Sequence, residues 1–284
     1  MAPRQRRRPP SAIAWSYPPS SHPQRSPSHV AHRTRPPAQP LLDDGIVDHI
    51  EKVAVDLERA REQWRGYVAA LQAHGWETIE VDPADDCPDS VFIEDTVVMF
   101  RNVAVISRPG ADSRKPETAG TRKALEALGC PIAEIREPGT LDGGDVLKIG
   151  DTVYVGRGGR TNAEGVAQLR AILAPLGGKV VAVPVTKVLH LKTAVTALPD
   201  GTVIGFPDFV DDPAIFERFV PVPEPHGTAV VCLSKSELII SASAPRTAAM
   251  LRDFGYTVTE VEISEYEKLE GCPTCLSVRV RALV

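Results

Sequence analysis

The stretch LQAHGWETIEV at residues 71–81 decides the fold, because its pattern returns three more times along the chain. Leu71 is followed four residues later by Gly75, and an apolar residue, Val81, stands six residues after that glycine. The same spacing occurs in LEALGCPIAEI (125–135), LAPLGGKVVAV (173–183) and LRDFGYTVTEV (251–261). A leucine one turn before a glycine, followed by alternating apolar residues, is typical of a helix that ends at the glycine and leads into a strand.

Pairs of apolar runs around short turns lie between these predicted helices. They predict β-hairpins at residues 97–106, 145–156, 193–205 and 230–240. A fifth helix, without the glycine, is expected at Asp212–Phe219. The repeating unit is then strand, strand, helix, strand, used about five times. Repeats of this size, with strands and helices alternating, favour a closed radial α/β array in one domain of about 245 residues.

The composition is that of an ordinary globular protein, with 43% hydrophobic and 24% charged residues among 284. It excludes a wholly disordered or collagen-like chain, and no apolar run approaches the ~20 residues that span a membrane. The net charge of −5 hides an asymmetry, since residues 1–40 hold seven basic residues and no acidic ones. The rest carries a net charge of −12, which disfavours nucleic acid as a partner and suits a cationic ligand.

The first 40 residues hold 10 of the 26 prolines and few apolar side chains. Such a segment gains too little from burial to offset its ordering entropy. We therefore expect a disordered, basic, Pro/Arg-rich tail at residues 1–28 and one α/β catalytic domain at 29–284, with a first strand within His29–Arg35. The prolines oppose an amphipathic transit peptide, and Ser11–Ser28 lacks the apolar region of a twin-arginine signal.

The five cysteines, at 87, 130, 232, 272 and 275, are odd in number and irregular in spacing. That pattern is not a disulfide framework and favours reduced thiols in the cytoplasm. The repeat suggests which cysteine is chemically active. Asp142 and His190 each stand 13 residues after their repeat glycine, and Asp95 and Cys275 each stand 20 residues after theirs. Because equivalent positions in a radial array face the same axis, we expect these four side chains to converge.

A cysteine and a histidine form a nucleophile and general acid–base pair. The surplus carboxylates in PDSVFIED (88–95) and TLDGGD (140–145) would raise the pKa of such a thiol unless a bound cation offset them. A guanidinium is planar, is bound bidentately by carboxylates, and carries an electrophilic carbon. The residues alone therefore suggest attack by a thiol on a guanidinium-type substrate.

Six ordered motifs carry a resemblance that runs from about Ala54 onward: PDSVFIED, SRPGADSR, TLDGGDVL, GRTN, LHLK and TCLSV. Together they resemble the dimethylarginine dimethylaminohydrolases of the pentein, or guanidine-modifying, superfamily. The resemblance implies a five-bladed α/β propeller and a dimethylargininase activity. That activity hydrolyses a C–N bond of Nω-methylated arginine, a cationic amino acid, to give citrulline and methylamine or dimethylamine. It implies no cofactor, metal, nucleic acid or membrane partner, and a monomer or homodimer.

The resemblance also assigns residues. Cys275 matches the nucleophile, His190 the general acid–base, and Asp142 the acid that supports His190. Substrate-binding residues are implied at Asp89, Glu94, Asp95, Arg108, Arg160 and Leu269. The arginines would clamp the substrate carboxylate, and Asp95 would bind the guanidinium nitrogens. Residues 36–50, where the family has a lid, match poorly, and no residue is assigned there.

Other interpretations of the same residues are less favoured. Cys272-Pro-Thr-Cys275 matches a redox or zinc motif, but it precedes an alternating strand rather than a helix, and no second ligand pair accompanies it. Arginine deiminase and agmatine deiminase are the alternative enzymes. The chain is short for the first, and agmatine would leave Arg108 and Arg160 without a carboxylate. A catalytically idle pentein-fold binding module, whose basic tail recruits an anionic partner, is the non-enzymatic alternative.

Overall fold

The structure, a computed structural model, describes residues 32–34, 36, 45–82 and 84–280. The expected tail at residues 1–28 lies outside this part of the chain. The first described strand, β1 (His32–Thr34), falls within the segment where it was predicted.

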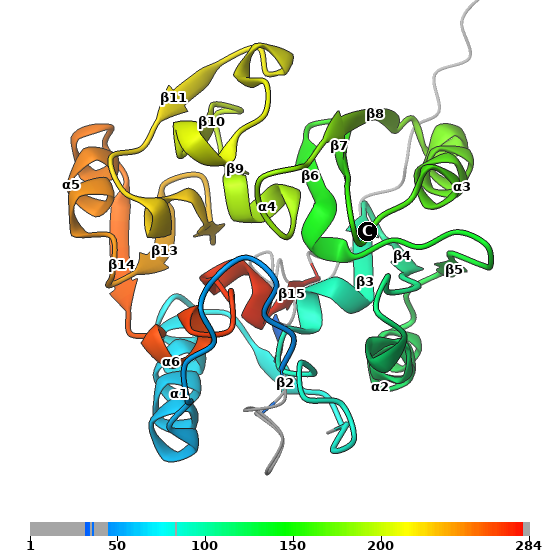
Figure 1. The fold of residues 1–284 in the computed structure, drawn as a ribbon, viewed down its shortest axis with the longest axis horizontal. Helices are drawn as coiled ribbons and strands as arrows, with labels where there is room; N and C mark the ends of the chain where they lie inside the picture. The colour runs from blue at the N-terminus through cyan, green and yellow to red at the C-terminus, as the bar shows by residue number, and fades with distance from the viewer. Residues whose placement is uncertain (1–31, 35, 37–44, 83, 281–284) are drawn as a thin grey trace, which may run out of the picture.

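Strands in the described residues form five three-stranded sheets, arranged around a common centre (Figure 1). The first two strands of each sheet are antiparallel and the second and third are parallel. The five-bladed α/β propeller is confirmed. The sheets are β15 (Val278–Arg279), β1 and β2 (Thr78–Glu80); β3 (Val97–Phe100), β4 (Val103–Ile106) and β5 (Ile132–Glu134); β6 (Val146–Ile149), β7 (Thr152–Arg157) and β8 (Lys179–Pro184); β9 (Val195–Ala197), β10 (Val203–Gly205) and β11 (Phe219–Pro221); β12 (Val230–Cys232), β13 (Glu237–Ser241) and β14 (Thr257–Val261).

Four outer helices connect the parallel strands of four sheets (Figure 1): α1 (Leu57–Ala73), α2 (Thr118–Ala127), α3 (Ala163–Leu173) and α5 (Pro245–Asp253). Each is followed by its repeat glycine, and all four glycines have positive φ, between 74° and 92°. That backbone conformation is unfavourable for a residue with a Cβ atom, which explains the glycine at each of these turns. The four predicted helix ends are confirmed.

The fifth predicted helix, at Asp212–Phe219, is wrong. The segment forms only a short 3-10 turn, η7 (Pro213–Ile215), and Phe219 already belongs to β11. Phe216 is extended and buried against Tyr154 of β7 and Phe219. The apolar side chains of residues 212–219 therefore pack on the neighbouring sheets from an extended backbone, not from a helix. The sheet of β9, β10 and β11 keeps the strand order of the others without an α-helix between its parallel strands.

A short helical turn precedes the first strand of each sheet, and we call these five segments the inner turns. They are η2 (Ile93–Thr96), η4 (Gly143–Asp145), α4 (Leu191–Ala194), η8 (Pro225–Thr228) and η9 (Pro273–Leu276). Neighbouring inner turns contact one another in the order η9, η2, η4, α4, η8. Because α4 takes up Thr193 and Ala194, the hairpin predicted at 193–205 begins two residues later than expected, at Val195.

Apolar side chains fill the space between neighbouring sheets. One cluster joins Val105 of β4, Val153 of β7 and Leu169 of α3, all with 0% of their surface exposed. Another packs Tyr67 and Leu71 of α1 against Ile239 of β13. Such clusters fix the sheets relative to one another, and so fix the inner turns. No helix in the described part of the chain is long and apolar enough to cross a membrane.

Candidate active site

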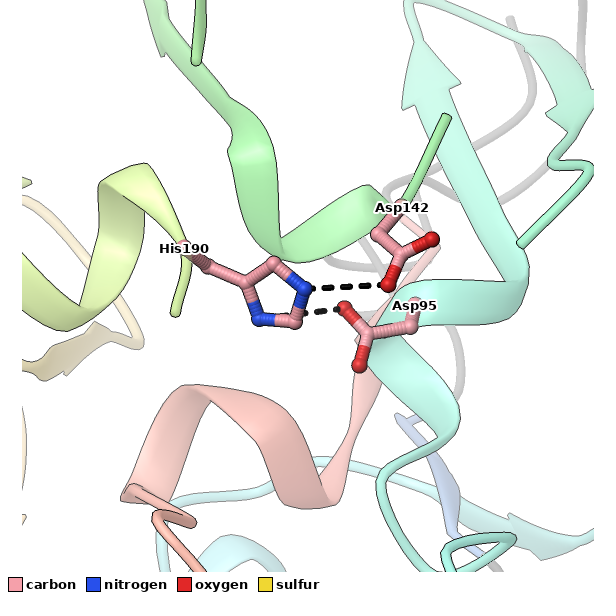
Figure 2. Close-up of side chains that lie close together, drawn as sticks. All are labelled: Asp95, Asp142 and His190. Carbon is pink, nitrogen blue, oxygen red and sulfur yellow. Dashed lines mark hydrogen bonds and ion pairs between the residues drawn. The ribbon is translucent and has the colours of Figure 1, made fainter. Parts of the chain in front are cut away.

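Inner turns from different sheets bring a histidine and two aspartates together (Figure 2). His190, at the start of α4, donates from Nε2 to Oδ2 of Asp142 at 3.0 Å. Its Nδ1 lies 3.9 Å from Oδ1 of Asp95, which belongs to η2. All three side chains are buried. The structure therefore brings together three of the four side chains that the repeat register predicted to face a common axis.

Two adjacent glycines let the backbone approach this group. A Cβ atom on Gly144 would lie 2.7 Å from both Asp95 Oδ1 and His190 Nδ1. A Cβ on Gly143 would collide with the carbonyl oxygen of Glu94. With the glycines in place, the Gly144 N–H donates to Asp95 Oδ1 at 2.8 Å. The glycines of the TLDGGD motif are thus required by close packing of η4 on η2.

The carboxylates hold His190 as a cation. Burial by itself lowers the pKa of this imidazole, but Asp95, with Asp142 and Asp145, raises it to about 10. His190 in this state carries a proton that it can give to a departing amine at neutral pH.

Arg114 balances the negative charge from the opposite side. It lies in η3 (Asp112–Glu117) and donates from Nη1 to Asp95 Oδ2 at 2.6 Å, and from Nε and Nη2 to both oxygens of Glu117. Against the effect of burial, His190 and Arg114 lower the pKa of Asp95 to about 2. Nη2 also donates to the carbonyl oxygens of Asp89 and Phe92. Arg114 thus fixes both the ionisation of Asp95 and the loop that carries it.

A second network fixes the position of His190 through the backbone. The Leu191 N–H donates to Asp145 Oδ1 at 3.0 Å, and Thr161 Oγ1 donates to Asp145 Oδ2 at 2.6 Å. Burial raises the pKa of Asp145 to about 6. On the other side, Asp142 Oδ1 accepts the N–H of Gly110 at 2.8 Å. Each oxygen of the two aspartates of TLDGGD therefore has a defined partner.

Cys275 lies in η9 beside a second thiol. Its Sγ is 3.1 Å from Sγ of Cys272, and a hydrogen bond joins them. This bond, together with burial, raises the pKa of Cys275, and Glu94 and Asp95 raise it further. This shift favours the neutral thiol of Cys275 at neutral pH.

A cavity of about 20 Å³ lies between Cys275 and His190, with room for about one water molecule. Six of the residues predicted from sequence line it: Asp89, Asp95, Arg160, His190, Leu269 and Cys275. Asp142 lies behind His190 as its hydrogen-bond partner. The cavity thus gathers a thiol, an imidazolium, carboxylates and guanidinium groups within one enclosure.

Two further predicted residues, Glu94 and Arg108, do not line this cavity. Glu94 pairs through Oε1 with Lys192 Nζ at 2.5 Å, and its buried Oε2 has no hydrogen-bond partner among the described residues. Arg108 donates from Nη1 to the carbonyl oxygen of Gly139 at 3.2 Å and lies near the exposed Glu137 carboxylate. Their roles at the substrate stay predictions.

The segment at residues 45–50 closes the cavity, although sequence reasoning assigned no residue there. Ile46 lines the cavity, and its N–H donates to both oxygens of Asp89, at 3.3 and 3.2 Å. Asp48 Oδ2 accepts from Arg160 Nη2 at 2.7 Å. The N–H groups of Asp48 and His49 donate to the carboxylate of Glu270. We call residues 45–50 the cover segment, because these bonds hold it across the cavity.

Three potential metal ligands meet in the site: Asp95, Asp142 and His190 have donor atoms within 4.8 Å of one another. The group does not fit a metal ion. His190 is protonated, and the Asp95 oxygens already accept from Gly144 and from the Arg114 cation. A metal ion would have to displace the His190 proton and these donors, because a ligand atom must offer a free lone pair.

Comparisons with known proteins agree with this geometry. The family model for arginine deiminase matches residues 41–227. The N(G),N(G)-dimethylarginine dimethylaminohydrolase of Streptomyces coelicolor is 64% identical over 257 residues, which cover 90% of this chain and 99% of that protein. The chain belongs to the dimethylarginine dimethylaminohydrolase family.

More distant relatives in this family share the whole fold. The dimethylarginine dimethylaminohydrolase of Pseudomonas aeruginosa is 37% identical over 88% of this chain and 98% of its own length. A structure of the Pseudomonas enzyme, a cysteine-to-serine mutant complexed with citrulline, superposes with a TM-score of 0.82. In that structural match the identity is 34%, over 88% of this chain and 98% of the other.

Proposed function

We propose that this protein hydrolyses an Nω-methylated arginine to citrulline and methylamine or dimethylamine. The observation that carries the proposal is that Cys275, His190 and Asp95 line one cavity. A thiol, a proton donor and an ionised carboxylate are what attack on a guanidinium carbon requires. The dimethylarginine dimethylaminohydrolases with which the chain aligns along nearly its whole length support the same reaction.

We propose that the positive charge of the substrate offsets the negative charge around Cys275. Without substrate, the carboxylates keep Cys275 protonated, because a thiolate beside Glu94 and Asp95 is unfavourable. A guanidinium held by Asp95 offsets that negative charge and lowers the pKa of the thiol. The nucleophile therefore ionises only when its target is present. Thiolate absorbance at neutral pH in the ligand-free protein would contradict this step.

The reaction then proceeds through one covalent intermediate. The Cys275 thiolate attacks the guanidinium carbon and forms a tetrahedral adduct. His190 donates its proton to the methylated nitrogen as the C–N bond breaks, and an S-alkylthiouronium remains on Cys275. His190, now neutral, takes a proton from water, which attacks the same carbon. The C–S bond breaks, citrulline leaves and the thiol is restored, while Asp142 keeps the imidazole in place.

The cover segment occupies the groups that would bind the amino-acid end of the substrate. Asp48 holds Arg160, the proposed carboxylate clamp, and the Ile46 N–H holds Asp89, the proposed ammonium ligand. A cavity of about 20 Å³ cannot hold an arginine side chain. We therefore propose that the cover segment opens to admit substrate. Glu94, Arg108 and Leu269 complete the proposed binding site.

An assay of citrulline formation tests the proposal, with dimethylarginine, monomethylarginine, arginine and agmatine compared at equal concentrations. We expect turnover of one or both methylated substrates and little turnover of the others. Cys275→Ser should abolish turnover, and His190→Gly should stop the reaction at or before the covalent stage. Cys232→Ser, which changes a cysteine of another sheet, is the matched control.

Preference for arginine or agmatine would assign a different guanidine hydrolase activity, and no turnover of any substrate would favour a binding module. Normal turnover in Cys275→Ser or His190→Gly would overturn the assigned roles. A cytoplasmic location belongs to the same proposal, because a reducing compartment keeps a thiol nucleophile active.

A further inference from the structure

Cys272 and Cys275 form a close pair of thiols at the start of η9. Cys272 is the residue that precedes the turn, and Cys275 stands in its first turn, with its N–H bonded to the carbonyl oxygen of Cys272 at 3.0 Å. Residues at these two positions of a helical turn face each other, which is why a capping side chain reaches the third residue of a helix. The spacing therefore places the two sulfur atoms 3.1 Å apart.

This pair differs from Cys87 and Cys130 in its accessibility, and from the partly buried Cys232 in having a second thiol beside it. Cys87 and Cys130 have 2% and 5% of their surface exposed. Cys232 donates to the carbonyl oxygen of Ala197 within a neighbouring sheet. Cys272 and Cys275 are only partly buried, and Cys275 lines the cavity. A small oxidant can therefore reach the partly exposed pair, and one that enters the cavity would meet Cys275 with Cys272 directly beside it.

We propose that Cys272 and Cys275 are a modification site at which a peroxide forms a reversible disulfide that blocks the active site. A disulfide has an S–S length of about 2.05 Å. The two sulfur atoms must therefore approach by only about 1 Å, a change that small side-chain rotations supply. The proposal that this bond stops turnover rests on the proposed function, in which Cys275 is the nucleophile.

The charge on the pair favours Cys272 as the first thiol to react. The hydrogen bond from Cys275 lowers the pKa of Cys272, while the same bond raises the pKa of Cys275. Cys272 therefore ionises more readily than Cys275. Cys272 also contacts Thr274 Oγ1 at 3.3 Å, a further donor to a thiolate.

The oxidation balances with hydrogen peroxide as the oxidant. The Cys272 thiolate attacks one peroxide oxygen, the O–O bond breaks, and a sulfenic acid and hydroxide result. The Cys275 sulfur then attacks the sulfenic sulfur and releases the second hydroxide, while the two thiol protons convert both hydroxides to water. Two electrons pass from the thiols to the peroxide. A dithiol reductant reverses the reaction by thiol–disulfide exchange.

Mass spectrometry tests the proposal directly when the full-length protein is treated with peroxide and then digested with trypsin. Trypsin cuts after Lys268 and Arg279 and releases Leu269–Arg279, whose only cysteines are the pair. After treatment of the full-length protein with excess peroxide, this peptide should become about 2 Da lighter. Citrulline formation should be lost at the same rate and should return with dithiothreitol. Cys232→Ser should behave in the same way as the unaltered protein.

Cys272→Ser is the decisive variant, with each protein's activity expressed relative to its own untreated sample. Its Cys275 has no partner thiol, so excess peroxide should convert it to sulfinic or sulfonic acid, about 32 or 48 Da heavier, and dithiothreitol should not restore activity. The proposal is overturned if the unaltered protein gains oxygen without losing 2 Da, or if Cys272→Ser recovers as fully as the unaltered protein. A disulfide that leaves turnover intact would instead refute Cys275 as the nucleophile.

Discussion

Arg114 carries the positive charge against which the carboxylates around His190 are balanced. It holds Asp95 on one side and Glu117 on the other, with about 4% of its surface exposed. Removing a buried charge leaves its partner buried and unpaired, which is strongly unfavourable. Arg114→Gln should therefore raise the pKa of Asp95, and reduce kcat by about 10- to 100-fold at neutral pH.

The pH profile separates this effect from simple loss of structure. Because His190 and Arg114 keep the pKa of Asp95 low against burial, loss of Arg114 should move the acid limb of kcat/KM to higher pH. Arg114→Lys, which keeps the charge, should shift the limb less. Lys115→Gln, which removes a neighbouring surface cation paired with Asp112, is the control. An unmoved acid limb in Arg114→Gln would show that Arg114 acts on the backbone alone.

His190 links stability to pH. Its pKa is raised from 6.5 to about 10 in the folded protein, so the fold binds this proton more tightly than the unfolded chain does. The stabilisation is complete below about pH 6.5 and is lost as the pH rises through about 10. The free energy of unfolding in urea should therefore fall between pH 7 and pH 10. His190→Gln should flatten that fall, whereas His226→Gln, at an exposed position, should not.

Sequence reasoning predicted which side chains gather at the site but not the partners that hold them there. Asp95, Asp142, His190 and Cys275 each stand 13 or 20 residues after a repeat glycine, and this spacing can be counted in the sequence without a structure. Arg114 lies inside a quoted motif, SRPGADSR, yet its role depends on burial against a carboxylate 19 residues earlier. Charge and burial of that kind arise only when the sheets assemble, and no spacing in the sequence predicts them.

At the level of helices and strands, the four helix ends could be predicted, but the absence of a helix at residues 212–219 could not. A glycine with positive φ is a local requirement, so the four ends could be read from short windows. Whether residues 212–219 coil or extend depends on Phe216, which packs on Tyr154 from another sheet. Tertiary packing of this kind overrides local preference.

Glu270 holds the cover segment in place through two hydrogen bonds, and we call it the latch. It has a positive φ of 58°, and its carboxylate accepts from the N–H groups of Asp48 and His49 at 2.8 and 2.9 Å. Glu270→Ala keeps the same backbone conformation and its cost, since alanine also has a Cβ, but removes both bonds. We expect faster amide hydrogen exchange at residues 45–50 and a KM lowered several-fold, because the cover segment competes with substrate for Asp89 and Arg160, with a smaller change in kcat.

Glu262→Ala, an exposed position after β14, is the matched control for that experiment. It should leave both exchange and KM unchanged. If Glu270→Ala gives the same protection at residues 45–50 as the unaltered protein, the cover segment is held by Asp89 and Arg160 without the latch.

At the scale of the whole molecule, the ring is closed by strands from distant parts of the chain. β1 is the middle strand of its sheet, antiparallel to β15 and parallel to β2. We propose that residues 29–284 are one catalytic domain that needs β1. A variant that begins at residue 36 should lose that strand and unfold at least about 5 °C lower. A variant that begins at residue 29 should keep the melting temperature and activity of the full chain, and equal melting of the two would contradict a role for β1.

The closure of the ring also sets the order in which the site is made. Cys275 lies in the inner turn that leads into β15, after Asp95, Asp142 and His190 have all been synthesised. A nascent chain on the ribosome can therefore contain the residues of four sheets and three of the proposed reacting side chains while it still lacks the proposed nucleophile. Chains that terminate before residue 275 lack this thiol and would form no covalent intermediate. If Cys275 is the nucleophile as proposed, activity should begin only after translation has passed residue 275.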